Sequence, residues 1–73
     1  MESIELGGNE YGRLFFEYDG DGLCQFVYGG TIVGVLRRSF RISWVDFCPE
    51  SIKRQCREFI SGLLHGTISI TNN

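Results

Sequence analysis

The side chains that could do covalent chemistry in this chain are its cysteines and its single histidine. Cys48 directly precedes Pro49, at the expected start of a helix, where the helix dipole can lower the pKa of a thiol and make it nucleophilic. The only histidine available as a base is His65, which lies at the other end of the same predicted helix. A span of about sixteen residues at about 1.5 Å each separates the two by about 24 Å. A cysteine–histidine pair within one chain is thereby excluded. We expect no enzyme, because a catalytic site would have to be assembled across subunits.

Metal and cofactor sites have equally little support in the sequence. Residues 19–22 (DGDG) resemble the start of a calcium-binding loop, but the twelfth position of such a loop requires a bidentate glutamate, and Gly30 stands there. Cys24, Cys48 and Cys56 are too far apart to form a zinc motif, and no phosphate-binding glycine loop is present. The sequence therefore predicts a turn at 19–22, free thiols in a reducing compartment, and no metal or cofactor.

Charge is unevenly distributed along the chain, although the net charge is only −2. Residues 1–21 carry six acidic groups against Arg13 alone, a balance of −5, and residues 22–73 carry six basic and three acidic groups, a balance of +3. The acidic groups could simply be the solvated positions of early strands. They could also form a docking patch for a basic groove on another protein, made of Glu17, Asp19 and Asp21.

The basic residues suggest an alternative function, binding of nucleic acid. We expect Arg37 and Arg41 to share one strand face and Lys53, Arg54 and Arg57 to share the outer face of the helix. Aromatic residues interleave with them, as in proteins that bind single strands. The pI of about 5.2 argues against this function, because nucleic-acid-binding domains are usually strongly basic.

The elements that must position these residues follow from the periodicity of the chain. Alternating or β-branched segments predict strands at 3–6, 11–18, 23–28 and 31–44, the last long and bent, with a tight turn at Gly29-Gly30. An apolar stripe at helical spacing predicts one helix from Pro49 to His65, capped by Gly66, and residues 67–71 alternate as a closing strand. The expected fold class is α+β: a four-stranded antiparallel meander, one amphipathic helix packed across one face, and a short C-terminal strand (β-β-β-β-α-β), in a single domain over residues 1–73.

Both faces of the predicted sheet are apolar. If the loop at 19–22 has four residues, one face holds Leu14, Phe16, Tyr18, Leu23, Val27, Ile32 and Leu36. The opposite face then holds Cys24 and the residues of a predicted interface, Phe15, Phe26, Tyr28, Val33 and Val35. A single helix can cover only one of these faces, and a large exposed apolar patch usually marks an association surface. The alternative is that bends, Trp44 and loop residues fold over the second face and bury it.

These observations predict a small non-enzymatic protein-binding module of the inhibitor, immunity or adaptor type. Proteins of phages and mobile elements in these classes are often single α+β domains of this size. We expect it to form a homodimer or to receive a partner protein on the second sheet face, because domains this small often need a second subunit for stability. No apolar run approaches the ~20 residues needed to cross a bilayer, so the expected location is cytoplasmic.

Overall fold

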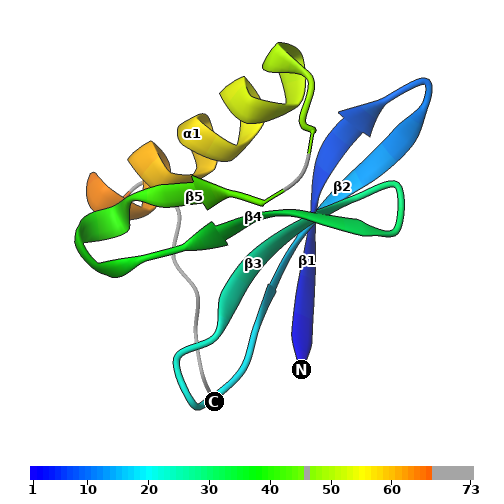
Figure 1. Cartoon of the computed structure of the whole chain (residues 1–73). Coiled ribbons are helices and arrows are strands. Elements are labelled where there is room, and N and C mark those ends of the chain that lie inside the picture. Colours follow the sequence, from blue (N-terminus) through cyan, green and yellow to red (C-terminus); the bar gives the residue numbers. More distant parts are fainter. Residues whose placement is uncertain (46, 67–73) are drawn as a thin grey trace.

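The computed structural model describes residues 1–45 and 47–66 and shows an α+β fold, an antiparallel sheet with one helix (Figure 1). The five strands pair with their neighbours in chain order, which makes the sheet a simple meander. The predicted fold class is confirmed, while the strand predicted at 67–71 lies outside the described residues. The elements are β1 (Glu2–Asn9), β2 (Gly12–Tyr18), β3 (Cys24–Tyr28), β4 (Thr31–Leu36), η1 (Arg38–Phe40), β5 (Ile42–Trp44) and α1 (Glu50–Leu64).

The predicted long strand over 31–44 is wrong, because this segment folds back on itself as the β4–β5 hairpin. Ser39 and Phe40 both adopt positive φ angles, 62° and 58°, and the N–H of Arg37 donates to the carbonyl of Arg41 at 2.6 Å. Of the residue types that usually mark turns, this turn contains only Ser39, so its composition is a weak signal. The sheet therefore has five strands among the described residues, where four were expected before the helix.

Two of the other three hairpin turns, β2–β3 and β3–β4, differ in how well the sequence predicts them. Gly29 and Gly30 form the expected two-residue turn, with φ angles of 59° and 82°, so Tyr28 pairs with Thr31. The loop after β2 is one residue longer than expected and pairs Tyr18 with Cys24. The carboxylate of Asp19 holds this loop, because its Oδ1 accepts hydrogen bonds from the N–H groups of Asp21 and Leu23 at 2.9 and 3.1 Å.

This one-residue difference moves most of the predicted interface into the core. Phe26 pairs with Phe16 on the face that α1 covers, and its side chain is 0% exposed. Val33 lies at an irregularity of the β3–β4 pairing and is also buried. Tyr28 packs against the core, and its hydroxyl donates to Asn9 Oδ1 at 2.7 Å. The assignment of these three residues to an exposed face is therefore wrong.

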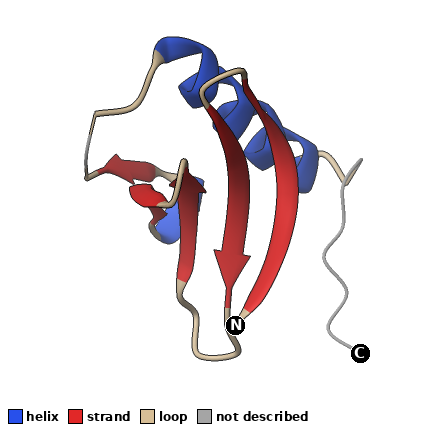
Figure 2. Cartoon of the chain, turned by 90° about the vertical axis from the view of Figure 1, so that its right-hand side faces the viewer, coloured by secondary structure: helices blue, strands red, loops and turns tan. Residues whose placement is uncertain are grey.

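The core lies between this sheet face and α1. The ring of Phe16 is at its centre, with centroids 4.8 Å from Phe59 of the helix and 5.2 Å from Phe26. The helix contributes four residues of its predicted apolar stripe to the core: Ile52, Cys56, Phe59 and Ile60. The other face of the sheet has no helix against it within the described residues (Figure 2).

A second contact fixes the helix to the edge strand β1. The side-chain amide of Gln55 binds Gly8 twice: its Oε1 accepts from the Gly8 N–H at 2.9 Å, and its Nε2 donates to the Gly8 carbonyl at 3.0 Å. The amide thus satisfies the strand's outward backbone groups as a neighbouring strand would. Gly7 and Gly8, which lie beyond the strand predicted at 3–6, are part of β1, at an irregularity in its pairing with β2.

Candidate protein-binding surfaces

The first candidate surface is the uncovered face of the sheet, which we call the open face and define by Phe15, Val27, Ile32 and Val35. Phe15 pairs with Val27, and Val27 pairs with Ile32, so three apolar side chains form a row across β2, β3 and β4. Ile32 is 42% exposed and the other three are partly exposed. Of the predicted interface residues, only Phe15 and Val35 lie here.

Charged and polar groups border the open face. Arg13 and Glu17 flank Phe15 two positions away on either side along β2, and side chains at this spacing share a face. Arg13 forms an ion pair with Glu5 of β1. Glu17 accepts a hydrogen bond from the amide of Gln25 at 2.9 Å, which orients both side chains in the row next to Phe15. The open face therefore has an apolar centre with one positive and one negative border.

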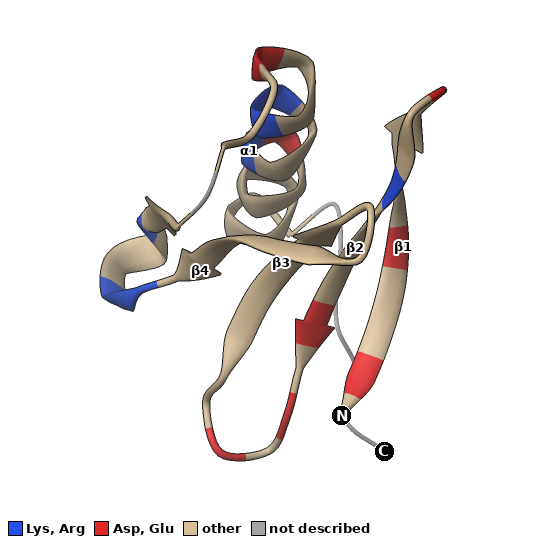
Figure 3. Ribbon diagram, turned by 45° about the vertical axis from the view of Figure 1, so that its right-hand side comes forward, with Lys and Arg blue, Asp and Glu red and all other residues tan. Residues whose placement is uncertain are grey.

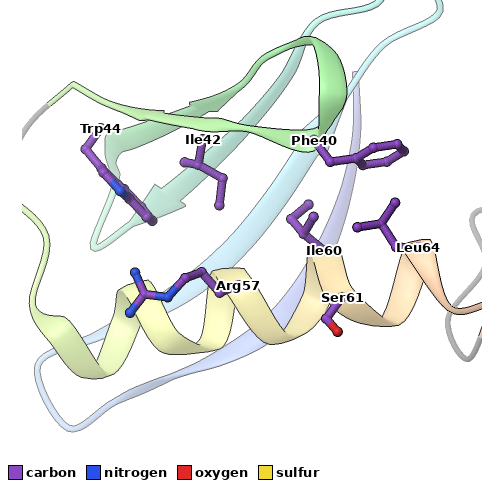
Figure 4. A pocket seen from close by; sticks show the side chains of 7 residues that line it. All are labelled: Phe40, Ile42, Trp44, Arg57, Ile60, Ser61 and Leu64. Atoms are coloured by element: carbon purple, nitrogen blue, oxygen red, sulfur yellow. The ribbon is translucent and has the colours of Figure 1, made fainter.

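The second candidate surface is a groove between the β4–β5 hairpin and α1 (Figure 4). Its volume is about 320 Å³. Figure 4 shows Trp44, Ile42 and Phe40 along the hairpin wall, facing residues of the helix. Phe40 and Leu64, at one end, are 47% and 57% exposed although both are large and apolar. The lining residues are Phe40, Ile42, Trp44, Arg57, Ile60, Ser61 and Leu64.

The predicted basic patch is divided between the turn and the helix. Arg37 and Arg41 lie on either side of the β4–β5 turn and, with Arg38, border a hollow next to the groove. Lys53 places its ammonium 5.3 Å from the centroid of Trp44, a cation–π contact. Arg57 lines the groove, whereas Arg54 is exposed on the helix and does not line it.

The helix cations are also partly neutralised. Arg57 Nη2 lies 3.1 Å from Glu50 Oε1, and Lys53 Nζ lies 3.9 Å from Glu50 Oε2. Within residues 1–45 and 47–66, no carboxylate forms an ion pair with Arg37, Arg38 or Arg41. Within the part of the chain that is described, the three arginines of the β4–β5 turn are therefore the cations with the least neutralisation by carboxylates.

The predicted acidic patch does not form one surface either. Glu17 lies on the border of the open face, while Asp19 and Asp21 lie in the β2–β3 loop, where Asp19 holds the backbone. The charges nevertheless separate in space as they do in sequence. Figure 3 shows most acidic residues on β1, at the end of β2 and in the β2–β3 loop, and most basic residues at the β4–β5 turn and on α1; the exceptions include acidic residues on α1 and a basic residue on β2.

The three cysteines are free thiols in environments that oppose reactivity. Burial raises the pKa of Cys48 despite the nearby Lys53, so the thiol at the helix start is not activated. Burial also raises the pKa of Cys56 to about 12, and burial together with the charge of Asp19 raises the pKa of Cys24. In the described part of the chain, no three or more histidine, cysteine, aspartate or glutamate residues converge as metal ligands would.

Cys56 gives a testable pH dependence. Its thiol has an ordinary pKa of 9.0 and keeps its proton to about pH 12 in the native state. Above pH 9 the unfolded chain therefore binds fewer protons than the native chain. The stability that this thiol contributes is complete below pH 9 and is lost as pH rises toward 12. We expect the free energy of unfolding to fall by about 1 kcal/mol per pH unit through this thiol.

Urea unfolding at about pH 8 and about pH 10.5 would measure the fall in stability. A Cys56→Ala variant serves as the control for the other alkaline titrations. It will be less stable throughout, but its stability should fall less steeply between the two pH values. Equal slopes for the two proteins would contradict the assignment to Cys56.

Comparisons with models of protein families, with curated proteins and with solved structures found no match to this chain. The candidate surfaces therefore rest on the chain's own geometry. No helix among the described residues is long and apolar enough to cross a membrane. Val27 and Ile32 were predicted on the face opposite Phe15 but lie on the open face, and Phe40 was not predicted as an exposed residue. For Val27 and Ile32 the available signal was Asp19, whose carboxylate can hold a loop longer than four residues. The sequence DGDG is compatible with either loop length.

Proposed function

We propose that this chain is a non-catalytic protein-binding module that pairs with a second copy of itself through the open face. The observation that carries the proposal is the row of Phe15, Val27 and Ile32, which crosses three strands with no helix of the described chain over it. A patch of this composition is typical of an association surface. A domain of 73 residues also has a small core, so burial against a second subunit would add to its stability.

The charged border supports a second copy as the partner, because the open face is complementary to itself. We place a two-fold axis between two facing sheets, perpendicular to β2 at Phe15. The two β2 strands then run antiparallel, and the two Phe15 rings meet near the axis. Arg13 of each copy lies opposite Glu17 of the other, since the two residues are equally spaced from Phe15. Packed sheets lie about 10 Å apart, a distance that these side chains can span.

The Phe15→Asp variant tests this pairing. It removes an aromatic group from the centre of the proposed interface and places two carboxylates next to each other at the axis. Loss of a central anchor usually costs at least about 2 kcal/mol, so we expect the dissociation constant of the dimer to rise about thirtyfold or more. Sedimentation velocity over a concentration series would measure it, with circular dichroism to verify the fold.

Tyr11→Asp is the matched control. It makes the same kind of change at a residue that is 83% exposed in the β1–β2 turn, away from the open face. We expect it to leave the dimer intact. A wild-type chain that sediments as a monomer at all concentrations, or a dimer equally weakened by both variants, would overturn the proposal.

Charge exchange tests the antiparallel arrangement. Arg13→Glu and Glu17→Arg should each weaken the dimer, because each places like charges opposite one another. The double variant should restore pairing, since every cross-copy pair again has opposite signs. Failure of the double variant to recover any affinity would reject this orientation of the two copies.

A further inference from the structure

We propose that the groove between β5 and α1 binds an extended acidic peptide segment of a partner protein, which adds to the edge of β5 and places a large apolar side chain in the groove. This goes beyond the proposed self-association, because the groove and the open face are different surfaces. Four features of the described residues support it: a free strand edge, an apolar groove beside that edge, an exposed aromatic residue held there, and adjacent unpaired cations.

The edge of β5 has backbone groups available for a further strand. The Arg37 N–H donates to the Arg41 carbonyl, and the Val45 N–H donates to the Val33 carbonyl. In an antiparallel pair the backbone groups of alternate residues point toward the partner strand and away from it. The N–H and carbonyl groups of Ile42 and Trp44 therefore point away from β4, and no described residue pairs with them. A peptide strand could satisfy these groups by strand addition.

The groove lies where the side chains of such a strand would point. Ile42 and Trp44, whose backbone groups point away from β4, are also the residues whose side chains form the hairpin wall of the groove (Figure 4). A strand added beside them would direct alternate side chains toward Ile60 and Leu64 of the helix. The volume of about 320 Å³ is at the lower end of the ~300–1,000 Å³ typical of ligand sites and suits one large apolar side chain.

Phe40, at one end of the groove, combines a strained backbone with an exposed ring. Its φ angle is 58°, a conformation that aromatic residues rarely adopt, and its side chain is nevertheless 47% exposed. Strained residues of this kind persist where the surrounding structure fixes them, often at ligand-binding positions. Here the strained turn holds the ring beside Leu64 at the mouth of the groove.

The charges next to the groove select an acidic peptide. Arg37, Arg38 and Arg41 have no ion-pair partner among the described residues, and Arg57, which pairs with Glu50, lines the helix side of the groove. Carboxylates flanking the apolar side chain would form charge-assisted hydrogen bonds with these guanidinium groups. A peptide fits better than a nucleic acid, because the groove wall is partly aliphatic at Ile42, Ile60 and Leu64 and the strand edge offers peptide-like donors and acceptors.

The fluorescence of Trp44 can report peptide binding, because Trp44 is the only tryptophan in the chain and lines the groove. The probe is a synthetic eight-residue peptide in which glutamate alternates with valine and one phenylalanine. We expect its titration to change the Trp44 emission to saturation. Leu64→Asn and Arg41→Glu should each weaken binding at least tenfold, while Arg54→Glu, the same charge change on the helix away from the groove, should change it less than twofold.

Two further probes test whether the peptide binds by strand addition and whether the groove prefers a nucleic acid. A peptide with N-methyl groups on alternate residues, which removes strand hydrogen-bond donors, should bind at least tenfold more weakly. An oligothymidine of twelve nucleotides should not compete. No response to millimolar peptide, equal loss with Arg54→Glu, full binding of the methylated peptide, or preferential binding of the oligonucleotide would each overturn the proposal. The Phe15→Asp variant should bind the peptide normally, so failure of self-association would be distinguished from failure here.

Discussion

The Phe26→Asp variant is expected to be unfolded at room temperature. Phe26 is 0% exposed, and its ring centroid lies 5.2 Å from that of Phe16 and 6.4 Å from that of Phe59. Truncating a buried phenylalanine to alanine usually costs about 3–5 kcal/mol, and a buried, unpaired carboxylate adds to this cost. A domain of this size has a total stability of only about 4–11 kcal/mol. Circular dichroism and a urea titration would show the loss of the cooperative transition.

Val27→Asp is the matched control for this variant, one residue further along β3. Val27 lies on the open face, where a carboxylate can remain in water, so this variant should keep a cooperative unfolding transition. It should also lose self-association, as we expect of Phe15→Asp. A folded Phe26→Asp protein beside an unfolded Val27→Asp protein would mean that the two sheet faces are assigned the wrong way round.

The contrast between these two residues shows what the sequence could predict about the sheet. Alternation correctly predicted that β3 has two apolar faces, but not which face meets the helix. That choice depends on whether the loop after Tyr18 has four or five residues, because a shift of one residue exchanges the faces of a strand. The hydrogen bonds that the Asp19 carboxylate accepts from Asp21 and Leu23 stabilise the longer loop, and they depend on three-dimensional geometry that composition does not reveal.

The groove could not be predicted from the sequence, because the β4–β5 turn that forms it could not be predicted. Residues 31–44 alternate in a way that favours one strand, and Ser39 and Phe40 are poor candidates for positive φ. Without the hairpin turn, Phe40 falls on the buried side of a long strand, and neither the β5 edge nor the groove exists. The helix was easier to predict, because its apolar stripe and the proline before it give consistent local signals.

Gly8→Ala is the second variant with a large expected effect, because two separate features of the fold require glycine there. The φ angle of Gly8 is 124°, which residues with a Cβ rarely adopt. An added Cβ would also collide with the backbone carbonyl of Gly12 and lie 2.8 Å from the Cα of Arg13. These are atoms of β2, which cannot move aside without opening the β1–β2 pairing.

The helix would be affected as well, since both hydrogen bonds of the Gln55 amide go to Gly8. If β1 shifts, the partly buried amide loses its partners, a cost of about 1–3 kcal/mol in addition to the backbone strain. We therefore expect Gly8→Ala to lower the free energy of unfolding by about 3–5 kcal/mol in a urea titration.

Gly20→Ala is the control for Gly8→Ala, because a Cβ at Gly20 would meet no atom within 4 Å and its φ angle is not positive. It should be neutral or stabilise the fold by up to about 1 kcal/mol, through the lower entropy of the unfolded chain. Gln55→Leu then separates the two contributions at Gly8, since it removes the amide hydrogen bonds without straining β1. It should account for only part of the loss. If Gly8→Ala were as stable as Gly20→Ala, β1 could not have this backbone conformation, and the attachment of the helix to the sheet edge would have to be reassigned.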